Sequence, residues 1–187
     1  MNVYRLLPDR EKYGKLHFDG QLLLENLGDE TFMSFHSLSY PIADKWPKCQ
    51  GWFEEWRSDD LLKNKPDIYL EDAALVLSEK AKTALAAVIR CSGELLPFTC
   101  DDETFYLLII HPVLPVDEKN SELEIEYGNM VGTKKLSFKP EDVGTHVLFK
   151  TAYDVFLSLF CSEKFKQAVE KHQLKGLFFE SELAYSI

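Results

Sequence analysis

A five-residue motif, Ser-Glu-Lys-x-Lys, occurs twice in this chain of 187 residues, first at Ser78–Lys82 and again at Ser162–Lys166. An apolar run precedes each copy, AALVL in one case and VFLSLFC in the other, and a stripe of apolar residues at helical spacing follows. Each stripe ends near a glycine, Gly93 or Gly176, and each glycine precedes another apolar stretch. The sequence therefore predicts one strand–helix–strand unit that is used twice.

The motif residues suit the start of a helix, and the glycine that follows each stripe suits its end. A serine hydroxyl at the N-cap accepts a hydrogen bond from an otherwise unpaired amide, and a following glutamate lies near the positive end of the helix dipole. A serine four residues before a lysine could instead form a nucleophile and its base, but no glycine-rich oxyanion loop accompanies either copy. We therefore predict that the motif is structural, with helix caps at Ser78, Gly93, Ser162 and Gly176.

The segments around these units have mostly β-like patterns. MNVYRLL predicts an opening strand, Asp19-Gly20 a hairpin turn, and TFMSFHSLSY a further strand. TFYLLIIHPV is apolar on both faces, which is typical of a central strand, and SELEIEYGNMVGTKKLSFKP predicts a hairpin in which glutamates face lysines.

We therefore expect an α+β fold with a mixed or mainly antiparallel sheet, few helices and two similar strand–helix–strand units. A β-rich region with a tryptophan-rich loop should occupy residues 1–65, and an α+β region should occupy residues 66–187. With 45% hydrophobic residues, the chain can build a sizeable core, so both regions should join in one compact domain.

The chain carries 31 acidic and 21 basic residues, a net charge of −10. This charge disfavours nucleic acid and anionic membranes as partners, and it permits a basic protein partner, although solubility alone would explain it equally well. The N-terminus lacks the apolar core of a signal peptide, and no apolar run is long enough to span a bilayer. The four scattered cysteines fit a reducing compartment, so we expect a cytoplasmic protein.

No stretch has the residue spacing of a common catalytic, metal-binding or phosphate-binding motif. We therefore expect no enzymatic activity, no cofactor and no metal. The alternative is a polar pocket for a small ligand or a reaction, formed by His111 with Asp101 or Asp102. These residues would otherwise be a strand-end histidine and acids of a solvated loop.

The most unusual segment is WPKCQGWFEEW, residues 46–56, which has four aromatic residues with acidic residues among and beyond them. Tryptophan is enriched at binding hot spots, and acidic neighbours accelerate association with a basic partner. A satellite core that fixes a long loop would have the same composition. We predict that Trp52→Ala and Trp56→Ala weaken partner binding without unfolding the protein. The interface candidates are Trp46, Trp52, Phe53, Glu54, Glu55, Trp56, Asp59 and Asp60.

From Pro66 onward the order of motifs resembles a bacterial family of immunity proteins from polymorphic toxin systems (immunity protein family eleven type). The matching stretches are LSEK at 77–80, LP at 96–97, YLLII at 106–110, DEKNS at 117–121 and the closing segment 162–179, in which LKGLFF is the most specific part. The chain departs from the pattern at His111-Pro112, where a small polar residue is expected.

This resemblance carries over no catalytic residues. It implies a protein that binds and silences a cognate toxin, and the absence of a signal peptide implies that the two meet in the cytoplasm. The acidic charge favours a basic toxin. A homodimer, or a module that assembles with itself, stays open as a further alternative.

Overall fold

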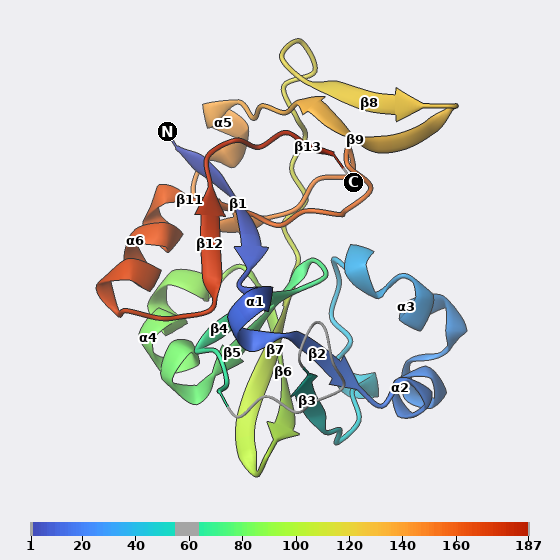
Figure 1. Cartoon of the computed structure of the whole chain (residues 1–187), viewed down its shortest axis with the longest axis vertical. Coiled ribbons are helices and arrows are strands. Elements are labelled where there is room, and N and C mark those ends of the chain that lie inside the picture. The colour runs from blue at the N-terminus through green and yellow to red at the C-terminus, as the bar shows by residue number, and fades with distance from the viewer. Residues whose placement is uncertain (1, 55–63, 187) are drawn as a thin grey trace.

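The structure is a computed structural model that describes residues 2–54 and 64–186 (Figure 1). Short helices and small antiparallel sheets make up the described part, so the α+β prediction is confirmed. The strands are β1 (Val3–Pro8), β2 (Lys15–Phe18), β3 (Gly51–Glu54), β4 (Ile68–Glu71), β5 (Ala74–Ser78), β6 (Gly93–Cys100), β7 (Glu103–Ile110), β8 (Glu122–Glu126), β9 (Asn129–Lys135), β10 (Leu148–Phe149), β11 (Phe160–Ser162), β12 (Leu177–Glu180) and β13 (Tyr185–Ser186). The helices are α1 (Arg10–Tyr13), α2 (Gly20–Leu27), α3 (Asp29–Met33), α4 (Glu79–Ile89), α5 (Pro140–Val143) and α6 (Glu163–Lys171), with 3-10 turns η1 (Phe35–Ser37) and η2 (Ala43–Lys45).

Two four-stranded sheets have equivalent strand orders, which confirms the repeated unit. In the order β4-β5-β7-β6, helix α4 connects β5 to β6 across the central strand β7. In the order β10-β11-β1-β12, helix α6 connects β11 to β12 across β1. The central strand of the second sheet therefore comes from the N-terminus. Strand β1 lies within residues 1–65 and is hydrogen-bonded to β11 and β12 of the later region. The expected boundary between two regions at residue 65 therefore divides this sheet.

The register of the strands is equivalent in the two sheets. Tyr106 of β7 lies opposite the residue that precedes the first motif serine. Tyr4 of β1 lies opposite the residue that precedes the second. Two positions further along, Leu108 and Leu6 are both buried in the same core. β1 is therefore the counterpart of β7.

The two units share one hydrophobic core, and their helices α4 and α6 pack side by side (Figure 1). Full burial of a large apolar side chain stabilises the fold by roughly 1.5–3 kcal/mol, so this shared interior holds the two units together. Its buried members come from equivalent places in both units and include Leu6, Leu75, Leu77, Leu85, Leu108, Leu159, Cys161, Phe165 and Val169.

Residues 19–37 are helical rather than extended, so the prediction of a β-rich N-terminal region is wrong for this stretch. Asp19, expected in a hairpin turn, is the N-cap of α2, and its carboxylate accepts a hydrogen bond from the Leu22 amide at 3.0 Å. Leu23 and Leu27, one helical turn apart, face a second core against the other side of the β5–β7–β6 sheet. The expected strand TFMSFHSLSY instead supplies the end of α3 and η1.

The prediction of glycine C-caps is also wrong. The C-cap residue of each helix lies three or four positions before Gly93 or Gly176. A Cβ on Gly93 would lie 1.8 Å from the carbonyl oxygen of Ile109, and a Cβ on Gly176 would lie 2.1 Å from that of Ile68. Both glycines are therefore required by the close approach of a neighbouring strand.

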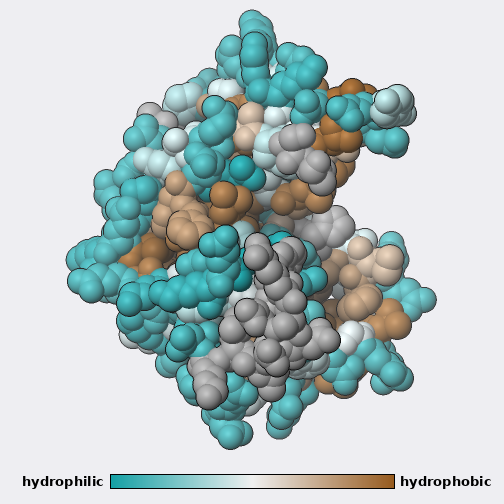
Figure 2. All heavy atoms as spheres, viewed as in Figure 1, coloured by the Kyte–Doolittle hydropathy of each residue, from teal (hydrophilic) through white to brown (hydrophobic). Residues whose placement is uncertain are grey.

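Most of the visible face is hydrophilic, and apolar side chains gather on the β8–β9 hairpin, left of the centre over β1 and β12, and around α2 and α3 (Figure 2). A hollow lies between the hairpin and α2–α3 on the right of the view. No helix within residues 2–54 and 64–186 is long and apolar enough to cross a membrane.

Candidate functional site

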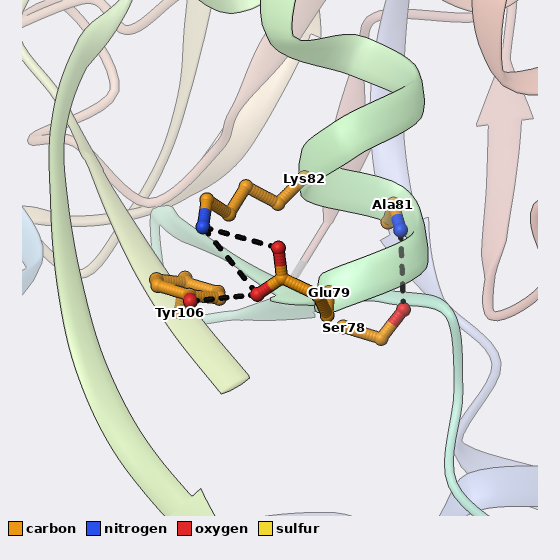
Figure 3. A network of polar contacts seen from close by, with 5 residues as sticks. All are labelled: Ser78, Glu79, Ala81, Lys82 and Tyr106. Carbon is orange, nitrogen blue, oxygen red and sulfur yellow. Dashed lines mark hydrogen bonds and ion pairs between the residues drawn. The ribbon is translucent and has the colours of Figure 1, made fainter. Parts of the chain in front are cut away.

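The first motif copy forms a polar network with the central strand β7 (Figure 3). The Tyr106 hydroxyl donates to the Glu79 carboxylate at 2.7 Å. Lys82 Nζ lies 3.2 Å from the same carboxylate and 4.0 Å from the centroid of the Tyr106 ring. The hydrogen bonds from Tyr106 and then Lys82 lower the pKa of Glu79, so this carboxylate stays ionised and unsuited to donate a proton.

The second motif copy repeats the two tyrosine contacts on β1, whereas its second lysine, Lys166, forms its ion pair with Glu170 and not with the motif glutamate. The Tyr4 hydroxyl donates to Glu163 at 2.6 Å, and this bond is the main cause of the lowered pKa of Glu163. Lys166 Nζ lies 5.5 Å from the centroid of the Tyr4 ring. In both copies, therefore, the motif glutamate and the second lysine meet a tyrosine of the central strand. These contacts tie each helix to the middle of its sheet.

The two motif serines differ in their hydrogen bonds. The Ser78 hydroxyl accepts a bond from the Ala81 amide at 3.2 Å, so it caps α4 as predicted (Figure 3). Ser162 has the N-cap position of α6 but makes no side-chain cap bond, and its buried hydroxyl has no partner among the described residues. The prediction of a hydroxyl cap is therefore wrong for Ser162. This residue keeps the extended backbone of an N-cap position, but its side chain does not accept a hydrogen bond from the first turn of α6.

The polar pocket that sequence patterns offered as an alternative does not form. Asp101 and Asp102 make the turn before β7, whereas His111 follows the last residue of β7. An eight-residue strand therefore separates them by roughly 25 Å. Burial lowers the pKa of His111, and its Nε2 atom has no partner within the described part of the chain. No group of three or more His, Cys, Asp or Glu side chains there could hold a metal ion.

Two of the aromatic interface candidates face the interior. Phe53 is buried and packs edge-to-face on Tyr69 with ring centroids 5.4 Å apart, so its prediction as an interface residue is wrong. Trp46 is half-buried against the second core and stacks on Phe35. Its indole N–H donates to the Pro97 carbonyl at 2.8 Å. Trp46 and Phe53 therefore fix the polypeptide that leads into β3.

The alternation of β3 turns Trp52 and Glu54 to the opposite, half-buried side. The Trp52 indole stacks on His17 at 6.0 Å between centroids and donates to the Glu54 carboxylate at 2.6 Å. Glu54 also lies 3.3 Å from His17 Nε2. This cluster is accessible but already paired within itself. The candidates Glu55, Trp56, Asp59 and Asp60 lie outside the described residues.

The loop formed by residues 151–158 has no signal in the sequence, because the apolar run VFLSLFC, residues 155–161, predicts a strand before the second motif. Only the last two residues of that run are in a strand, β11. Val155 and Phe156 instead have φ angles of +49° and +64°, and Val155 and Leu157 are exposed. A Val-Phe pair gives no sequence signal for this backbone conformation, since both residues disfavour it.

The chain matches one known protein family. Residues 66–182, more than half of the chain, match the immunity protein family Imm11. No curated protein matches the chain significantly. The matched region contains both repeated units apart from β1, which completes the second of them. The chain therefore belongs to the Imm11 family of immunity proteins.

Proposed function

We propose that this protein neutralises a cognate bacterial toxin by binding it directly in the cytoplasm. Membership of the immunity protein family carries this proposal. The contacts of the repeated motif support it, because both glutamates and their lysines are engaged with a tyrosine and hold the fold together. A role in binding a protein needs no further chemistry from these groups.

The charge of the chain supports a basic toxin as the partner. The net charge is −10, and the exposed outer strand β8 has the sequence ELEIE. Of its three glutamates, Glu122 pairs with Lys134 at 3.5 Å, whereas Glu124 and Glu126 form no ion pair with another described residue. Unpaired surface carboxylates attract a lysine- and arginine-rich surface and speed the encounter.

Trp52 and Glu54 are a second candidate contact, together with the predicted interface residues 55, 56, 59 and 60. The observation in their favour is that Trp52 faces away from the core while Phe53 faces into it. The tests of this contact are Trp52→Ala and Trp56→Ala, which should weaken toxin binding without unfolding the protein.

Co-expression tests the function itself. Immunity genes of this kind commonly follow the gene of their toxin, so the toxin domain encoded immediately upstream is the partner to express. Cells that make this toxin together with the chain should grow, and the two proteins should purify as a complex. A toxin from an unrelated system is the control. Continued poisoning by the upstream toxin, with no complex, would refute the proposal.

A further inference from the structure

We propose that the segment 151–158, here called the 151–158 loop, is a toxin-contact element that places Val155 and Leu157 in an apolar recess of the toxin. This inference rests on the function proposed above and names a binding surface for it. Its evidence is independent of the family match, since it comes from backbone conformation, side-chain exposure and charge.

The backbone of the loop is strained by its sequence. Three turns in the described chain have two successive residues with positive φ angles: Asp101-Asp102, Tyr127-Gly128 and Val155-Phe156. Both residues of the first turn are aspartates and the second turn has one glycine, which tolerate such angles, whereas the third turn has only a β-branched valine and a phenylalanine, which disfavour them. Strain of this kind persists only where surrounding contacts enforce it, and it is concentrated at functional sites.

Hydrogen bonds within the loop and to neighbouring elements hold this conformation. The Leu157 amide donates to the Asp154 carbonyl at 3.1 Å, and the Phe156 amide donates to the Thr151 carbonyl at 3.2 Å. The Asp154 side chain is buried and receives a hydrogen bond of 3.5 Å from the hydroxyl of Tyr185 in β13. At the base of the loop, the buried Lys150 donates to the Leu38 carbonyl. The loop is therefore held rigidly, which lowers the entropy lost on binding.

The strained turn directs its apolar side chains outward. Val155 is 52% exposed and Leu157 is 47% exposed, whereas Asp154 is fully buried. A turn that served the fold alone would gain from burying these side chains, or from asparagine or glycine in place of the valine. The molecule instead retains an unfavourable backbone and presents apolar groups to solvent, which is typical of a preformed binding element.

The surroundings of the loop indicate the chemistry of its partner. Tyr185 links the loop to β13, which pairs with β9 of the sheet whose outer strand is the acidic β8. In Figure 1, the β10–β11 connection and the β8–β9 hairpin lie on the same side of the upper half of the molecule. The complementary surface is therefore an apolar recess bordered by lysine or arginine side chains that face Glu124 and Glu126.

Val155→Asn separates binding from folding, because asparagine tolerates a positive φ angle but lacks the valine methyl groups. With the upstream-encoded toxin domain as the probe, the dissociation constant should rise about tenfold or more. The melting temperature of the free protein should rise by roughly 2–4 °C. Leu157→Ser should weaken binding to a similar extent without the gain in stability, since residue 157 is not among those with a positive φ angle.

Phe178→Ser is the matched control, because Phe178 is 55% exposed on β12, on the other side of Figure 1. It should leave toxin affinity within about twofold. Unchanged affinity of both loop variants, with tight binding by the wild type, would overturn the loop assignment and leave the proposed function standing. Loss of self-association in the loop variants, with toxin affinity unchanged, would overturn it in favour of a second copy of this chain. A wild-type protein that does not bind the toxin would overturn both proposals.

Discussion

Leu6→Ala should destabilise the protein by about 3–4 kcal/mol, although residue 6 lies outside the region that matches the family. Leu6 is 1% exposed, and it comes from the central strand of the second sheet. Its side chain belongs to the core that both repeated units share. Truncation removes buried apolar atoms and leaves a cavity there, which costs about 2.7–5 kcal/mol in well-packed interiors.

This loss is large against a typical total stability of about 5–15 kcal/mol. For a chain of this length it corresponds to a fall in melting temperature of roughly 6–16 °C. Urea unfolding followed by circular dichroism measures the free energy directly. Leu108→Ala, the equivalent change in the first sheet, should cost the same within about 1 kcal/mol. The exposed Ile125→Ala should change stability by less than about 0.5 kcal/mol. A cost below about 1 kcal/mol for Leu6→Ala would refute the place of β1 in the core.

Two further predictions concern the two motif serines and the buried carboxyl group of Asp154. Ser78→Ala should lower the free energy of unfolding by about 1 kcal/mol, because it removes the hydrogen bond that caps α4. Ser162→Ala should lower it clearly less, since the Ser162 hydroxyl makes no cap bond. Equal losses of stability in urea unfolding would contradict this difference. Burial raises the pKa of Asp154 from 3.8 to about 6. Between pH 4 and 6 the folded protein therefore keeps a proton on this carboxyl group that the unfolded chain releases. The free energy of unfolding consequently falls as the pH rises through this window. Between pH 4 and 6 the free energy of unfolding of the wild type should fall by about 3 kcal/mol relative to that of Asp154→Asn. Parallel curves of stability against pH for the two proteins would contradict this prediction.

Local patterns were sufficient to predict the elements that depend on neighbours in sequence. The opening strand, the central strand β7, the β8–β9 hairpin and the repeated unit all have a clear periodicity or motif. The prediction failed at residues 19–37 because Asp19-Gly20 suits a helix start as well as a turn, and three consecutive leucines have no distinct period.

Features that depend on distant parts of the chain were not predictable. The pairing of β1 with β11 and β12 joins residues more than 150 positions apart. Gly93 and Gly176 have their role because another strand passes close to them, and a single sequence does not show that approach. The conformation of Val155 is likewise imposed by its surroundings against its own preference.

Which residues of the aromatic segment face the core also depends on the structure around them. Composition alone left both an interface and a satellite core open for residues 46–56. The β3 strand divides the candidates, with Phe53 inside and Trp52 outside. Strict alternation would have predicted this division, had the segment been recognised as a strand.

Titration calorimetry of the purified chain with the toxin domain encoded immediately upstream tests the central claim most directly, when toxin activity is followed in the same samples. Neutralisation by binding predicts saturable heat with a dissociation constant on the order of nanomolar, and loss of toxin activity in proportion to the complex formed. The absence of binding between two folded proteins, or a toxin that keeps full activity in the saturated complex, would contradict it.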